Sequence, residues 1–67
     1  MSPMEQAQVY LATGSTCRAA SICKRLVEDN PSNENLLMLA EVYMQQGLHE
    51  DAIDLHLRAV KGSTRVQ

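Results

Sequence analysis

The chain has 67 residues and a formal net charge of −2, and 45% of its residues are hydrophobic, which allows a folded core but only one small domain. The mild negative charge suggests neither a strongly basic surface that attracts nucleic acid nor a disordered acidic tail. The longest uninterrupted apolar run, residues 36–40, is far too short to cross a bilayer, and the first residues lack the basic and apolar segments of a secretory signal. We therefore expect a cytoplasmic protein without a membrane partner; the alternative, a mature fragment of an exported protein, has the same sequence features.

A first helix is predicted to begin at the start of the chain. Ser2 is a suitable N-cap, Pro3 fits the first helical position, and Glu5 can close a capping box with the serine. Apolar residues recur at helical spacing up to Gly14, which lets the backbone leave the helix through a left-handed conformation. We therefore expect this helix to end near Thr13.

A second helix is predicted between two further breaks in the pattern. Ser15 or Thr16 can cap its start, and Asn30-Pro31 stops it, because the residue before a proline disfavours helical geometry. Its apolar positions are Ala19, Ala20, Ile22, Cys23, Leu26 and Val27. The first two helices therefore form one hairpin.

A third helix is predicted from Ser32 or Asn33, either of which can cap it, to the break at Gln46-Gly47. Its apolar positions recur at helical spacing and are Leu36, Leu37, Leu39, Ala40 and Tyr43.

A fourth helix is predicted over residues 49–61. Acidic residues in its first turn and basic residues in its last turn suit the helix dipole, and Gly62 is placed to end it. Residues 63–67 have the composition of a polar tail. No strand pattern with a period of two competes with the helices. The predicted fold class is therefore all-α, with two stacked antiparallel helical hairpins.

The two predicted hairpins are copies of one sequence pattern. The identical positions lie 33 residues apart and include Val9 and Val42, Tyr10 and Tyr43, Gly14 and Gly47, and Ala19 and Ala52. A period of this length indicates a unit that cannot bury its own hydrophobic face and must stack on a copy of itself. We therefore expect one domain over residues 1–62, with repeat one at 2–31 and repeat two at 32–62, that binds other molecules rather than catalysing a reaction.

The pattern resembles the tetratricopeptide repeat, in which an aromatic-x2-Leu-Gly-x2-Tyr helix is followed by an Ala-x3-Phe helix and a closing proline in about 34 residues. Repeat two carries the motif as Leu36, Leu39, Ala40, Tyr43, Gly47, Ala52, His56 and Ala59. Repeat one keeps Ala7, Tyr10, Gly14, Ala19, Cys23 and Pro31. Cys23 and His56 stand at the site of the family's large aromatic residue and fill it only in part. The resemblance implies a protein–protein interaction module whose first helices line a concave groove.

By this analogy, the groove floor is formed by side chains from the first helix of each repeat. They are Met4, Gln8 and Leu11 from repeat one and Leu37, Met38, Glu41, Met44 and Gln45 from repeat two, with Ala12 as a further candidate. Methionine adapts its shape at low cost, so the groove suits an extended or helical peptide of a partner protein. An alternative interpretation of Leu11, Leu37 and Met38 is that they belong to the interhelical core.

The fourth helix is predicted to carry a second interaction surface. Its Leu57 replaces Lys24 of repeat one, and together with Ile53, His56 and Val60 it makes the helix apolar on more than one side. Arrays of such repeats normally need three or more copies and a polar capping helix. We therefore expect this face to bind a second copy, giving a homodimeric scaffold, or a helix of another protein.

The cysteine and histidine residues predict neither a metal site nor a cofactor site. Cys17 and Cys23 lie about 9 Å apart along one helix and on different faces, so we expect free thiols that act as small buried or half-buried hydrophobic residues. His49 and His56 lie two turns apart, roughly 10 Å, too far to hold one metal ion. We expect both histidines to take part in helix packing.

Enzymatic activity and nucleic-acid binding are both disfavoured. No acid, base and nucleophile converge in the pattern, and no phosphate-binding loop is present. The basic residues Arg18, Lys24 and Arg25 lack interleaved aromatic residues, which indicates a solvated helix face in a net acidic chain.

Overall fold

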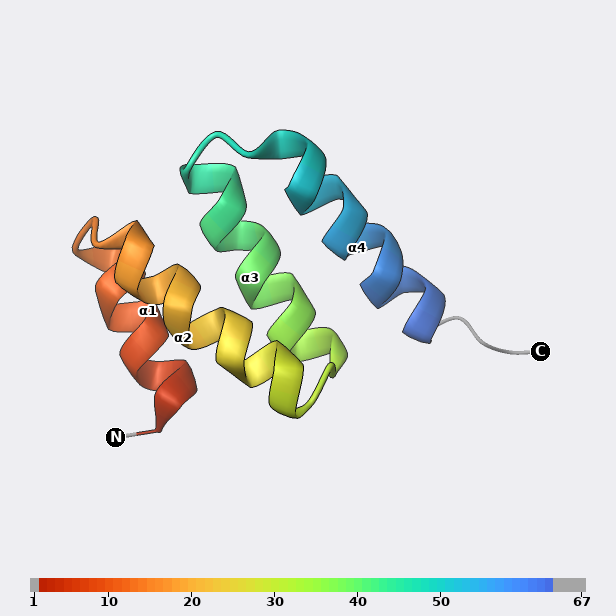
Figure 1. Ribbon diagram of the computed structural model, residues 1–67, viewed down its shortest axis with the longest axis horizontal. Helices are drawn as coiled ribbons and strands as arrows, with labels where there is room; N and C mark the ends of the chain where they lie inside the picture. Colours follow the sequence, from red (N-terminus) through yellow and green to blue (C-terminus); the bar gives the residue numbers. More distant parts are fainter. Residues whose placement is uncertain (1, 64–67) are drawn as a thin grey trace.

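The computed structural model describes the backbone of residues 2–63 and the side chains of residues 2–61. Its helices are α1 (Pro3–Ala12), α2 (Thr16–Asp29), α3 (Asn33–Gln45) and α4 (His49–Ser63). Each helix packs on the next one in the chain, so α1 and α2 form one antiparallel hairpin, α3 and α4 form another, and α2 joins them by packing on α3 (Figure 1). The predicted all-α fold with two stacked hairpins is confirmed.

Serine side chains start two of the helices as the sequence predicts. At α1, the Ser2 Oγ accepts a hydrogen bond from the Glu5 backbone N–H at 3.3 Å, and the Glu5 carboxylate accepts one from the Ser2 backbone N–H at 3.2 Å. At α3, the Ser32 Oγ accepts a hydrogen bond from the Asn35 backbone N–H at 3.2 Å. Ser15 is the N-cap residue of α2, but its side chain makes no capping hydrogen bond.

The two hairpins turn with the same local geometry. Gly14 and Gly47 have φ angles of 86° and 81°, the left-handed conformation that glycine adopts without strain. The N–H of each glycine donates to the carbonyl three residues before it, at 3.2 and 3.1 Å, and the N–H of the next residue donates to the carbonyl five residues before it, at 2.8 and 2.9 Å. These paired bonds satisfy the last carbonyls of α1 and α3, so each helix ends in a Schellman motif.

The end of α4 differs from the prediction. The helix continues through Gly62 to Ser63 rather than ending at Lys61. Glycine permits the left-handed conformation that ends a helix but does not require it, so Gly62 is tolerated inside the last turn. Ser63 therefore belongs to α4, and the remaining residues of the expected polar tail, 64–67, lie outside the described residues.

Hydrogen bonds from the Asn35 side chain stabilise the connection between the two hairpins. Its side-chain amide donates to the backbone carbonyl of Asn30 at 2.8 Å and to that of Leu26 at 3.3 Å. Both acceptors lie at the end of α2, where helical carbonyls begin to lack partners within the helix. The three residues between α2 and α3 are thereby held by a side chain that the sequence analysis did not single out.

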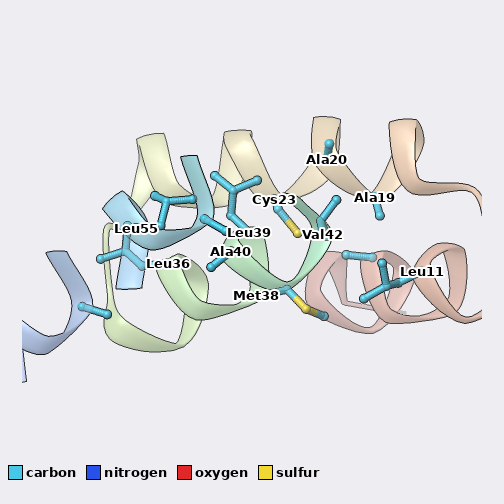
Figure 2. Packing of buried hydrophobic residues seen from close by; sticks show 13 residues of the cluster. Leu11, Ala19, Ala20, Cys23, Leu36, Met38, Leu39, Ala40, Val42 and Leu55 are labelled. Carbon is cyan, nitrogen blue, oxygen red and sulfur yellow. The ribbon is translucent and has the colours of Figure 1, made fainter. Parts of the chain in front are cut away.

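The core is one continuous cluster to which all four helices contribute. It contains Ala7, Leu11, Ala19, Ala20, Cys23, Leu36, Met38, Leu39, Ala40, Val42, Ala52, Leu55 and Ala59. Ala7 and Ala40, which stand where the family pattern has glycine, are both fully buried. The largest fully buried side chains are Cys23 of α2 and Val42 of α3, which lie side by side between these helices in Figure 2. The hairpins therefore stack through a buried layer of small and medium side chains.

Candidate functional site

Side chains of α1 and α3 line a hollow of about 330 Å³, which we call the α1–α3 hollow. Its lining residues are Gln8, Leu11 and Ala12 from α1 and Met38, Glu41 and Gln45 from α3. Ligand pockets range from about 300 to 1,000 Å³, so this hollow is at the small end of that range. It has room for one or two side chains of a partner.

Helical spacing brings the lining residues together. The α1 residues are spaced i, i+3 and i+4, and the α3 residues i, i+3 and i+7, so each set lies on one face of its helix. Leu11 and Met38 are buried and form the floor, and Figure 2 shows Met38 extending from α3 toward α1. Gln8, Glu41 and Gln45 are exposed at the rim. The site therefore has an apolar floor with polar groups around it.

The structure brings together part of the predicted groove. Five of the eight predicted residues line the α1–α3 hollow, namely Gln8, Leu11, Met38, Glu41 and Gln45, and so does the further candidate Ala12. The other three lie outside its lining. Met4 is partly buried against the core, whereas Leu37 and Met44 are 43% and 46% exposed.

The alternative interpretation as interhelical core applies to two of its three residues. Leu11 and Met38 belong to the buried cluster while they also line the hollow. Leu37 does not belong to that cluster, because almost half of its surface is exposed.

A single carboxylate dominates the electrostatics of the α1–α3 hollow. Among the described residues that line it, only Glu41 is charged. Burial of the Cys23 thiol, together with the negative charge of Glu41, raises the pKa of that thiol. Cys23 is therefore a neutral thiol near pH 7 and lacks the thiolate that nucleophilic catalysis needs. The hollow offers apolar surface, two amides and one negative charge.

A second hollow, of about 610 Å³, lies between α1 and α2, and the sequence analysis missed it. It is lined by Pro3, Gln6, Ile22, Arg25, Leu26, Glu28 and Asp29. Pro3 and Gln6 are the counterparts, 33 residues earlier, of Leu36 and Leu39, which are buried in repeat two. Repeat one therefore has a proline and a glutamine where repeat two has two leucines. This difference was the sequence signal that predicts an open, polar hollow between α1 and α2.

The four residues predicted as an interface lie on one face of α4. Ile53, His56, Leu57 and Val60 follow the spacing i, i+3, i+4 and i+7. Ile53, Leu57 and Val60 are 56%, 55% and 54% exposed, and His56 is also exposed. Large apolar side chains at such exposure form a surface patch of the kind that marks interaction sites.

Three residues are more exposed than the sequence predicts. His49 and His56 are exposed rather than packed between helices, and Cys17 is exposed rather than buried or half-buried. The reason is clearest at the aromatic site of the family pattern. Cys23 is fully buried because α3 covers it, whereas no helix among the described residues lies beyond α4 to cover His56. Both thiols are free, as predicted.

Among the described residues, the remaining charged and ligand-type side chains are not grouped into a metal site. The Arg18 guanidinium lies over the Tyr10 ring, 5.8 Å from its centroid, which is a cation–π contact between α1 and α2. Within residues 2–63, no three potential metal ligands are grouped together. No helix of this described part is both long enough and apolar enough to span a membrane.

Comparison with known proteins agrees with the fold and the repeat. A family model described as tetratricopeptide repeat matches residues 10–61. No curated protein and no solved structure matches the chain. The family match extends from the last turn of α1 into the last turn of α4, and so includes both glycine turns.

Proposed function

Because the chain belongs to the tetratricopeptide repeat family, whose repeats are protein–protein interaction modules, we propose that the α1–α3 hollow binds a peptide segment of a partner protein. The observation that carries the proposal is the hollow itself, with a buried apolar floor and an exposed polar rim. An apolar floor supplies affinity, and a few placed polar groups fix orientation. The same residues include no nucleophile beside a base, so we propose that the protein is not an enzyme and needs no cofactor.

The chemistry of the rim supports a particular kind of peptide. Met38 and Leu11 favour an apolar side chain that enters the hollow, and methionine tolerates variation in its shape. Gln8 and Gln45 can donate to and accept from the backbone of an extended or helical segment. Glu41 favours a lysine or arginine next to the inserted side chain and disfavours acidic peptides. The partner motif is therefore an apolar residue with an adjacent basic residue.

Selection from a random peptide library on the immobilised chain tests this proposal. We expect the selected peptides to share an apolar residue beside lysine or arginine, and to shift the amide NMR signals of Gln8, Met38 and Gln45. Glu41→Lys should weaken their binding at least about tenfold, because the attraction between Glu41 and a basic residue of the peptide becomes a repulsion. Glu34→Lys is the matched control, since it makes the same charge change on an exposed residue of α3 outside the hollow.

Two results would contradict the proposal. One is a set of selected peptides whose NMR shifts map away from the α1–α3 hollow. The other is equal weakening by Glu41→Lys and Glu34→Lys, which would mean that the peptides respond to overall charge rather than to the site.

Self-association as a structural scaffold is a second candidate function, favoured by the exposed apolar side chains Ile53, Leu57 and Val60 of α4. In both candidates the partner is a protein, and we propose no role for nucleic acid or a membrane. We also propose the cytoplasm as the location, because two free thiols suit a reducing compartment.

A further inference from the structure

A comparison of the two repeats shows which surfaces become buried when one repeat stacks on another. Each residue of repeat one has a counterpart 33 positions later in the same local environment of its own hairpin. Where two counterparts have side chains of similar size, as Leu11 and Met44 do, a difference in their exposure comes from the neighbouring repeat. Repeat one has a repeat stacked on its C-terminal side, and the described residues place none on the corresponding side of repeat two (Figure 1).

Five counterpart pairs change from covered to exposed. The covered member comes first in the pairs Met4 and Leu37, Leu11 and Met44, Ala20 and Ile53, Cys23 and His56, and Val27 and Val60. Leu11 is 9% exposed against 46% for Met44, and Ala20 is 6% exposed against 56% for Ile53. The exposed members, with Leu57, form what we call the end face. Leu37 and Met44 of α3 belong to this set because their counterparts in repeat one are covered, and they do not line the α1–α3 hollow.

The opposite end of the molecule does not match the end face. Two residues of α3 that face repeat one are Met38, which lines the hollow together with α1 residues, and the fully buried Val42. Their counterparts on α1 are Glu5 and Val9, both exposed. A head-to-tail contact between two copies would therefore press an apolar face against the Glu5 carboxylate and a single valine, and would remove that charge from water. The apolar surface that best complements the end face is another end face.

The charges of α4 determine how two end faces are oriented. Its N-terminal half carries Glu50, Asp51 and Asp54, and its C-terminal half carries Arg58 and Lys61. Glu50, Leu57 and Lys61 are spaced i, i+7 and i+11, so the two charges border the apolar residues along one edge. When two copies of α4 run antiparallel across a two-fold axis, the acidic half of each lies against the basic half of the other, and Glu50 approaches the Lys61 of the second copy.

We propose that the end face binds the end face of a second copy, with the two α4 helices antiparallel, to give a closed two-fold dimer. The dimer covers Ile53, Leu57 and Val60 of both chains and pairs Glu50 with Lys61 in both directions. An isologous contact uses each end face once, so the assembly stops at two copies. This inference rests on self-association as the second candidate function and is independent of peptide binding in the α1–α3 hollow.

Sedimentation equilibrium of the whole chain over a hundredfold range of concentration tests the dimer. We expect the mass to approach two copies at high concentration. Leu57→Glu should weaken the dimer at least about a hundredfold, because it buries two carboxylates in an apolar contact. Leu57 is 55% exposed in the single chain, so helical circular dichroism should remain that of the native protein.

Charge exchange tests the antiparallel orientation. Glu50→Lys or Lys61→Glu alone should weaken the dimer roughly tenfold, because each replaces two attractions by two repulsions. The double variant with both changes should recover the native dissociation constant. Asp51→Lys is the matched control, since it makes the same charge change one residue from Glu50 but on the side of α4 away from Leu57.

Three outcomes would overturn the proposal. A monomer throughout the range would mean that the end face binds no second copy. A mass that rises beyond two copies would indicate head-to-tail stacking, and a double charge variant that stays weak would exclude the antiparallel pairing. Peptide binding in the α1–α3 hollow can be measured on monomeric Leu57→Glu, so failure of the dimer and failure of the hollow are separate results.

Discussion

At the scale of single residues, Cys23 and His56 show how one position of the repeat has two different environments. The two residues lie 33 positions apart in the sequence, and each occupies the same position in the second helix of its hairpin. Cys23 is fully buried against α3, whereas His56 is exposed on α4. Side-chain chemistry agrees with this difference, because a thiol is a small hydrophobic group that tolerates complete burial and an imidazole is polar.

Burial of Cys23 predicts a loss of stability in alkali. The folded state raises the pKa of its thiol through burial and the charge of Glu41, so the unfolded chain loses this proton first. The contribution to the free energy of unfolding is complete below the ordinary thiol pKa of about 8.5 and falls as the pH rises from there toward the raised value. Urea unfolding between pH 7 and pH 10 measures the effect.

Two cysteine variants separate this titration from other alkaline effects. Cys23→Ala should show a smaller loss of stability over the same pH range, although it is less stable throughout. Cys17→Ser changes the exposed thiol and should keep the full loss. An equal pH dependence in both variants would contradict the assignment to Cys23.

At the scale of elements, three serines occupy N-cap positions but only two act through their side chains. Ser2 and Ser32 accept capping hydrogen bonds, and Ser15 does not. The φ and ψ angles explain the difference. Ser2 and Ser32 are extended, with ψ of 156° and 161°, whereas ψ of Ser15 is 66°, because this residue also completes the tight turn at Gly14.

Alanine substitution of the caps measures this difference. Ser32→Ala should lower the free energy of unfolding by about 1 kcal/mol, because the backbone N–H of Asn35 loses its acceptor. Ser15→Ala should lower the free energy of unfolding by at most a few tenths of a kcal/mol, because no capping hydrogen bond is lost. Chemical denaturation of both variants provides the comparison, and a cost at Ser15 equal to that at Ser32 would refute it.

At the scale of the whole molecule, the two ends of the stack differ in polarity. The outer face of α1 carries Glu5 and one exposed large apolar residue, Val9, whereas the opposite end carries exposed Ile53, Leu57 and Val60. A polar surface is stable in contact with water, whereas burial of an apolar surface away from water is favourable. Removal from water therefore favours association at the α4 end more than at the α1 end.

Association through the end face predicts that thermal stability depends on protein concentration. Since only the folded chain forms the dimer, each tenfold increase in concentration should raise the Tm by roughly 3–5 °C. Leu57→Glu should remove this dependence. Differential scanning calorimetry at three concentrations checks the expectation, and a native Tm that stays constant would contradict it.

Local signals in the sequence were sufficient to predict the helices and the repeat. These signals are the capping box at Ser2, the left-handed glycines Gly14 and Gly47, and the helix break at Pro31. Each depends on interactions between residues that are close in the sequence, so each can be predicted from the sequence alone. The resemblance to the tetratricopeptide repeat placed Leu11, Met38 and Glu41 on one surface of α1 and α3, and these residues line one hollow. The length of α4 escaped prediction, because Gly62 has no local requirement to leave the helix.

The sequence by itself determined the two hairpins, their turns and the family, because each follows from interactions between residues close along the chain. Only the tertiary structure decided which apolar residues are covered. Leu11 and Met44 have the same place in the repeat, yet one is buried and the other exposed. Burial depends on whether a second repeat packs against the first, and that contact joins residues far apart in sequence.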